Sequence, residues 1–279
     1  NRDKPYDRFL QEQIAGDLLP VKTDEQWAEN LVATGFLAIG PKSLSEQNRV
    51  QFTADLVDEQ IDVTTRVILG TSVACARCHD HKFDPIPQSD YYAMAGIFAS
   101  TQAYYGVPAS QFGALGSIQN RNTTSLLVLP VEDTNPFDRH YTKDELAAMT
   151  AEIREARQEL FESRQTMRRG TADANNPNAP RPQVSIQNLI RLQNRIEMLS
   201  SLLGSVDENG KPLTFCMGVQ DKDRPSDAKL LVRGEIDQPA QTVKRDFPQV
   251  LRDQPATIPA GASGRLELAR WLTNADNPL

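Results

Sequence analysis

The chain has few cysteines, few histidines and no long apolar segment. Its 279 residues include 3 cysteines and 3 histidines. Three cysteines are too few for a disulfide scaffold, and an odd count leaves one thiol over. No run of about 18 apolar residues is present, so we expect no membrane-spanning helix. A strongly basic surface is also missing, because the net charge is −7, and this argues against a nucleic-acid partner.

The chain also lacks a signal peptide and an initiating methionine. It opens with Asn1 in "NRDKPYDRFLQEQIAGDLLP", a stretch that already has helical spacing. We therefore expect the sequence to be part of a longer protein, in which a missing leader says nothing about compartment.

What the chain does have is one loop that concentrates these rare residues. The stretch "SVACARCHDHKFDPIP", residues 72–87, holds two of the cysteines and two of the histidines. Cys75-Ala-Arg-Cys78-His79 has the spacing of a c-type haem attachment site, and the composition would produce it by chance only about 0.0003 times. Two cysteines three residues apart can form thioethers with one porphyrin, and His79 can then bind the iron as an axial ligand. We predict a covalent haem c here.

Three other interpretations of the loop remain open. Zinc could be bound by the two cysteines with His79 and His81, although four ligands within seven residues would be crowded. Cys75 and Cys78 could form a redox disulfide, but that motif normally opens a helix in a βαβ unit, which the sequence does not predict. The loop could also be structural and inert.

The second axial ligand of the iron is harder to assign. Met217 is the preferred candidate and lies in an expected strand. Met94 is on an apolar helical stripe that is typical of core packing, and His140 lies in a polar stretch that is typical of a surface.

The residues around the motif suggest supporting roles. His81 cannot bind the same iron face as its neighbour, so we expect it near a propionate or exposed. Arg77 and Lys82 could pair with propionates, or be solvated. A backbone carbonyl near Pro85 could accept the Nδ1 proton of His79.

The periodicity of apolar residues predicts a mainly α fold with a helical cytochrome-like segment, a helical-hairpin insertion and a small β-rich segment. Helices are expected over 5–19, 24–34 and 46–69, with another from about residue 89, so that the loop lies between two helices. Strands are expected in "SLLVLPV", "LTFCMGV" and "AKLLVRGEI".

The hairpin insertion is predicted by two heptad-like stretches. Thr142-x-x-Glu145 is a capping box, and apolar residues follow it at alternating heptad spacing. A second such stretch begins at Leu189 and ends at Leu203, so we predict an antiparallel hairpin of coiled-coil type over 142–205. It is either a self-packed arm or a surface that binds a protein partner.

These patterns divide the chain into five segments. We expect the C-terminal part of a cytochrome-c-like helical domain with the C-x-x-C-H loop, a linker, the helical hairpin, a β-rich connecting segment and the start of a following domain. Their predicted ranges are 1–105, 106–141, 142–205, 206–262 and 263–279.

The loop and its flanks resemble a known family. "CARCHDHKFDPIPQSDYYAMAGIFAST", with the preceding "DKPYDRFLQEQIAGDLLP" and "ATGFLAIGP", resembles planctomycete cytochrome-c-like domains of unknown function. "LLVRGEIDQPAQTVKRDFPQVL" is similar to the joining stretch, and "LARWLTNADNPL" looks like the start of the usual partner domain.

The resemblance implies a large exported protein, in the periplasm or at the cell surface, often with further cytochrome or binding modules. It implies haem attachment at Cys75 and Cys78 with His79 as ligand, and it assigns no sixth ligand and no substrate. The position of Met94 is commonly leucine in related sequences, which weakens Met94 as a ligand.

The sequence therefore predicts an exported c-type haem protein that transfers electrons to a redox partner protein or another cytochrome module, coupled to an unidentified oxidoreductase activity. One alternative is a peroxidase-like haem enzyme with an open sixth position. Another is a structural or interaction module with zinc at the loop and a docking hairpin. Whether this chain is itself an enzyme is left open.

Overall fold

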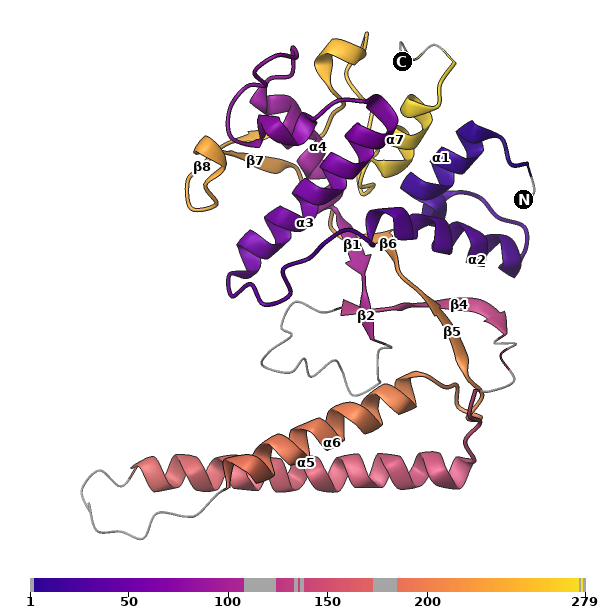
Figure 1. The fold of residues 1–279 in the computed structure, drawn as a ribbon, viewed down its shortest axis with the longest axis vertical. Coiled ribbons are helices and arrows are strands. Elements are labelled where there is room, and N and C mark those ends of the chain that lie inside the picture. The colour runs from indigo at the N-terminus through magenta and orange to yellow at the C-terminus, as the bar shows by residue number, and fades with distance from the viewer. Residues whose placement is uncertain are drawn as a thin grey trace. The chain divides into compact units, whose positions relative to one another are not determined.

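The fold is described from a computed structural model, which covers residues 3–107, 124–132, 135, 138–172, 185–275 and 277. The chain forms two compact units (Figure 1). Unit 1 comprises Asn1–Gly106, Asn120–Val131 and Phe215–Leu279, and unit 2 comprises Val107–Gln119 and Glu132–Thr214. The predicted linker 106–141 falls partly outside the described residues.

Unit 1 is built mainly from helices. They are α1 (Tyr6–Ala15), α2 (Asp24–Ala33), α3 (Arg49–Thr64), α4 (Gln88–Ala99) and α7 (Arg265–Leu272). Two of them begin at side-chain caps: Thr23 accepts a hydrogen bond from the Gln26 amide, and Asn48 accepts from the amides of Val50 and Gln51. The four predicted helices before residue 100 are confirmed.

Each sheet in the described part of the chain has two strands. The pairs are β1 (Thr101–Tyr104) with β6 (Gly218–Asp221), β2 (Gly106–Val107) with β3 (Thr124–Ser125), β4 (Leu127–Glu132) with β5 (Leu213–Cys216), and β7 (Ala228–Leu231) with β8 (Pro239–Val243). β1 and β6 are antiparallel, with Thr101 opposite Asp221 and Tyr104 opposite Gly218. The prediction of a mainly α fold with a small β segment is confirmed.

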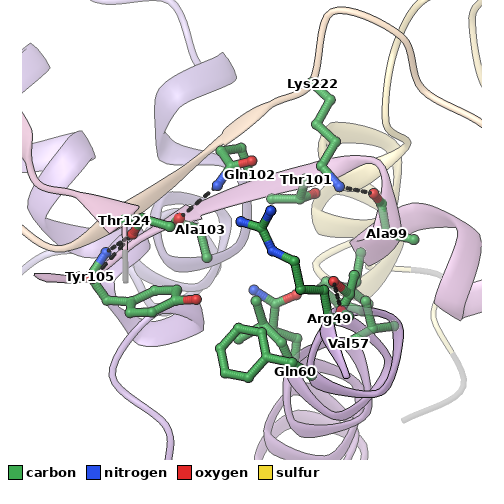
Figure 2. A pocket seen from close by; sticks show the side chains of 14 residues that line it. Arg49, Val57, Gln60, Ala99, Thr101, Gln102, Ala103, Tyr105, Thr124 and Lys222 are labelled. Carbon is green, nitrogen blue, oxygen red and sulfur yellow. Dashed lines mark hydrogen bonds between the residues drawn. The ribbon is translucent and has the colours of Figure 1, made fainter. Parts of the chain in front are cut away.

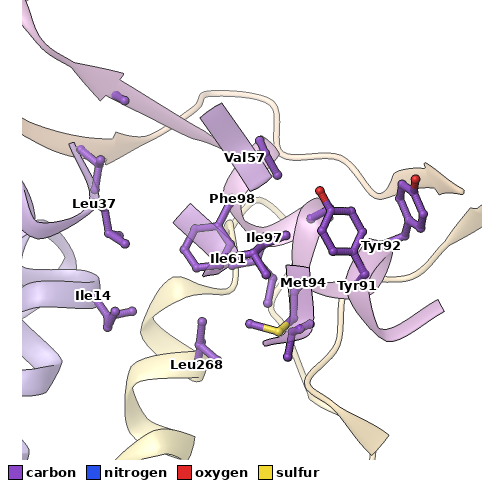
Figure 3. Close-up of a cluster of buried hydrophobic side chains, with 14 of the residues drawn as sticks. Ile14, Leu37, Val57, Ile61, Tyr91, Tyr92, Met94, Ile97, Phe98 and Leu268 are labelled. Carbon is purple, nitrogen blue, oxygen red and sulfur yellow. The ribbon is translucent and has the colours of Figure 1, made fainter. Parts of the chain in front are cut away.

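Helix α4 is the centre of the core of unit 1. Every residue from Asp90 to Phe98 is buried, as expected for a helix that is apolar all round. Its fully buried Met94, Ile97 and Phe98 lie among Ile14, Leu37, Ile61 and Leu268 (Figure 3). Met94 is therefore a core residue, as its apolar stripe predicts.

Helix α7 belongs to this same core. Residues 263–279 are expected from the sequence to open a following domain, but Leu268 and Ala269 are buried in the core cluster of unit 1. Arg265 has no exposed surface. Its guanidinium donates to Asp17 at 2.8 and 2.7 Å and to Asp221 at 3.2 and 2.6 Å.

Unit 2 contains the predicted hairpin, α5 (Lys143–Ala172) and α6 (Ile186–Gly204). The capping box forms: the Glu145 amide donates to Thr142 Oγ1 at 3.2 Å, and the Thr142 amide donates to Glu145 Oε2 at 2.8 Å. The two helices share one buried apolar seam that includes Ile153, Leu160, Ile196, Leu199 and Leu203.

The direction of the hairpin follows from its cross-helix contacts. Asn188 donates to Glu159, and Arg195, further along α6, donates to Glu152, which is earlier in α5. The helices are therefore antiparallel. No helix within the described ranges combines the length and the apolar composition needed to cross a bilayer.

We predict that Arg265→Met destabilises unit 1 by about 3–5 kcal/mol, because it leaves the carboxylates of Asp17 and Asp221 buried without their cation. The measurement is the free energy of unfolding from chemical denaturation followed by circular dichroism. Arg270→Met is the matched control, since Arg270 is exposed on the same helix. Equal stability of the two variants would contradict the assignment.

Candidate functional site

The C-x-x-C-H loop leaves α3 through a short helical extension, Thr65–Leu69, which ends at Gly70 in the left-handed conformation (φ 63°). Val73–Arg77 then form a 3₁₀ turn, in which side chains three residues apart lie above one another. Val73 and Ala76 have no exposed surface, while Cys75 and Cys78 are exposed. The turn therefore presents both thiols on its outer side, and both are free cysteines.

His79 follows directly and is exposed. Its Nδ1 lies 2.6 Å from the carbonyl oxygen of Asp80. A carbonyl only accepts hydrogen bonds, so Nδ1 carries the ring proton and Nε2 keeps its lone pair, as a metal-binding imidazole requires. A backbone carbonyl fixes the ring as predicted, but the predicted position near Pro85 is wrong.

His81 organises the loop from inside. Its side chain is only 7% exposed, so the expectation of an exposed ring is wrong. Nδ1 accepts from the amides of Asp84 at 2.8 Å and Phe83 at 3.3 Å, which leaves the ring proton on Nε2, 3.2 Å from Ser72 Oγ. Both ring nitrogens are therefore engaged within the loop.

This geometry bears on the zinc interpretation. Within the described ranges, no group of three or more histidine, cysteine, aspartate or glutamate side chains is arranged to hold a metal ion. The structure thus does not bring the four predicted zinc ligands together.

Arg77 ties the loop to α3. Its guanidinium is 3.0 Å from Asp55 and 3.6 Å from Asp58. Burial raises the pKa of Asp58, although the hydrogen bond from Tyr91 and the charge of Arg77 both lower it. The Arg77 charge is therefore shared with two carboxylates of the protein. Lys82 lies at the surface, 5.0 Å from the centre of the Phe83 ring.

The side chain of Gln88 connects the loop to strand β7, because it binds one backbone carbonyl of each. The side-chain Nε2 of Gln88 donates to Arg77 O at 2.8 Å and to Leu231 O at 3.1 Å. The Tyr92 hydroxyl also donates to Arg77 O, at 3.0 Å. These bonds connect the start of α4, the 3₁₀ turn and the end of β7.

Gly234, in the connection from β7 to β8, lies against the second thiol. Its φ is 75°, and a Cβ built there would be 2.8 Å from Cys78 Sγ. The missing side chain leaves room beside the sulfur. No pattern in the sequence indicates this residue, because nothing local connects residue 234 with residue 78.

A mostly apolar cavity of about 560 Å³ lies between α3, α4 and the β7–β8 pair. It meets the loop at Arg77. Its lining residues are Arg49, Val50, Thr53, Ala54, Val57, Arg77, Tyr91, Tyr92, Ala95, Ala99, Ala228, Lys229, Leu231, Ile236 and Pro239. No local pattern in the sequence predicts this cavity, because its walls come from segments far apart in the chain.

The predicted sixth ligand is not placed near the loop. Met217 is 43% exposed and lies just before β6, with its carbonyl beside Gly35. β6 pairs with β1, which follows the last turn of α4. The loop precedes the first turn of this 12-residue helix, which is about 18 Å long. His140 is exposed in unit 2.

The residues of the loop fit a covalently attached haem. Two thiols point outward from one turn, His79 Nε2 keeps its lone pair, and Gly234 leaves space next to one sulfur. An apolar cavity adjoins the turn. Cys216, the third cysteine, is half-buried away from the loop beside α2 and β4.

Comparison with known protein families gives one match over this region. Residues 1–103 match a family model, PSCyt2, described as a protein of unknown function (DUF1549). The match includes α1 to α4 and the whole C-x-x-C-H loop, in line with the resemblance to planctomycete cytochrome-like domains. It does not reach the hairpin or α7, so the following partner domain stays a prediction. Searches of curated proteins and of solved structures found no match.

We predict that, in the reduced haem-free chain, Cys75 and Cys78 react with iodoacetamide at pH 8 at least tenfold faster than Cys216. Burial raises the pKa of the Cys216 thiol to about 11, which leaves little of it as the reactive thiolate. Peptide mass spectrometry over a time course measures the three rates. Equal labelling of all three cysteines would contradict the burial of Cys216.

Proposed function

We propose that this chain is a c-type haem protein that transfers electrons, within a protein exported to the periplasm or the cell surface. Cys75 and Cys78 hold the haem by thioether bonds, and His79 binds the iron. The observation that carries the proposal is the placement of two thiols on the outer side of one 3₁₀ turn, followed directly by a histidine whose Nε2 is free.

The chain's own residues determine how the group would be held. Val73 and Ala76 anchor the turn in the core, so the thiols cannot turn inward. The Asp80 carbonyl fixes the orientation of the His79 ring. His81 and Ser72 keep the backbone of residues 83 and 84 in place.

When bound, the haem supplies one-electron redox chemistry, and its potential depends on ligand identity, hydrogen bonding and burial. The exposed position of the loop supports exchange with a second protein, because a redox partner or another cytochrome module can approach the attachment site from solvent. We assign no sixth ligand, since Met217 lies at the other end of α4.

The central test is covalent haem attachment. We expect the chain, produced with a c-type maturation system, to give a c-type pyridine haemochrome spectrum after denaturation. Cys75→Ala/Cys78→Ala should abolish the covalent haem, because no thioether can form. Cys216→Ala is the matched control and should retain it. A colourless wild-type chain from cells that mature a control cytochrome would refute the proposal.

A second test examines the space beside Cys78. We expect Gly234→Ala to lower the ratio of haem to protein at least threefold, because the new Cβ displaces the Cys78 sulfur. Gly261→Ala is the control: it also has a positive φ, of 86°, but nothing within 4 Å of the new atom. Both changes carry a backbone cost of about 1 kcal/mol. The same haem content in both variants would show that Gly234 has no role at the attachment site.

A further inference from the structure

A second cavity, of about 260 Å³, lies at the other end of α4, between α3 and strand β1 (Figure 2). At about 30 Å³ per water molecule, this is room for a small organic molecule. Its walls combine the apolar side chains of Phe52, Val57 and Phe98 with polar groups from Gln60, Thr101 and Lys222.

Gln60 supplies a buried acceptor that is left without a hydrogen bond. Its side chain is part of the wall, and the residue is only 1% exposed. Its Nε2 donates to the carbonyl of Leu37 at 2.9 Å, which fixes the orientation of the amide. Among the described residues, nothing donates to its Oε1. A buried acceptor in this state favours a ligand that brings an O–H or N–H group.

Lys222 supplies a cation whose burial is not offset by an acid. Its Nζ donates one hydrogen bond, to Ala99 O at 2.7 Å, so two of its three N–H groups remain for a ligand. No carboxylate of the described part of the chain forms an ion pair with it, and burial lowers its pKa. A partly desolvated ammonium of this kind binds a carboxylate more strongly than a solvated lysine does.

Two further features of the wall indicate which kind of ligand the cavity can bind. The guanidinium of Arg49 extends into the middle of the view in Figure 2, between Tyr105 and Lys222, and adds a second positive charge to the wall. Phe52 and Tyr105, with ring centres 6.5 Å apart, form an aromatic side. The cavity therefore combines positive charge, one unpaired acceptor and an aromatic surface.

We propose that this cavity binds a small hydroxylated carboxylate, with the carboxylate at Lys222 and a hydroxyl group donating to Gln60 Oε1. The site is separate from the C-x-x-C-H loop and does not depend on haem attachment. It would give the protein a ligand-binding function besides electron transfer.

The test is isothermal titration calorimetry of the full chain with three probes of similar size. Gluconate has both the carboxylate and the hydroxyl groups, glucose has only hydroxyl groups, and hexanoate has only the carboxylate. We expect gluconate to bind at least tenfold more tightly than glucose or hexanoate. Undetectable binding of gluconate at 10 mM, or equal binding of hexanoate, would overturn the proposal.

Variants connect the binding to the named residues. Lys222→Gln removes the charge but keeps an amide that can donate to Ala99 O, and we expect it to weaken gluconate binding at least tenfold. Lys244→Gln, at an exposed lysine of unit 1, is the matched control and should change the affinity less than twofold. Thermal unfolding of both variants checks that the fold is intact.

Two results with these variants would count against the site. Unchanged gluconate binding by Lys222→Gln would place the ligand elsewhere on the molecule. Displacement of gluconate by an equal concentration of inorganic phosphate would show only general anion binding, without a role for Gln60.

Discussion

The buried guanidinium of Arg265 is the interaction on which the architecture of unit 1 depends. It joins three segments far apart in sequence: Asp17 after α1, Asp221 at the end of β6, and α7 itself. It also donates to the carbonyl of Ile14 at 3.1 Å. Burial alone would oppose the charge, but the hydrogen bonds and charges of the two carboxylates raise the Arg265 pKa. Removing Arg265 would leave both carboxylates without their cation, which is the strongly destabilising case for a buried ion pair.

The segments joined by Arg265 also fix the position of α4. β6 pairs with β1, which continues directly from the last turn of α4, while Leu268 of α7 packs into the core around the same helix. α4 is buried on nearly all sides, so it has little freedom to move within this core. Elements attached to its two ends are consequently held in fixed positions relative to each other.

Both proposed sites use this property of α4. The C-x-x-C-H loop precedes its first turn and is held by Arg77, Gln88 and Tyr92. The second cavity lies at its last turn, where Phe98 and Ala99 form part of the wall. The helix of 12 residues that runs from the loop to the second cavity is about 18 Å long. The apolar cavity beside the loop and the second cavity share wall residues, Arg49, Thr53, Val57 and Ala99.

The sequence by itself determined the features that depend on neighbouring residues. The Cys75–Cys78–His79 spacing, the capping box of Thr142 and Glu145 and the periodicity of the hairpin are local, and their physical causes lie within a few residues or turns. Only the tertiary structure decided that Gly234 lies beside Cys78, that Arg265 pairs with Asp17, and that α7 packs into the core of unit 1. It also determined that Met217 lies away from His79 and that both ring nitrogens of His81 form hydrogen bonds within the loop. These outcomes depend on contacts between segments that are distant in the chain, and such contacts are selected by the packing of the whole core, which no local pattern encodes.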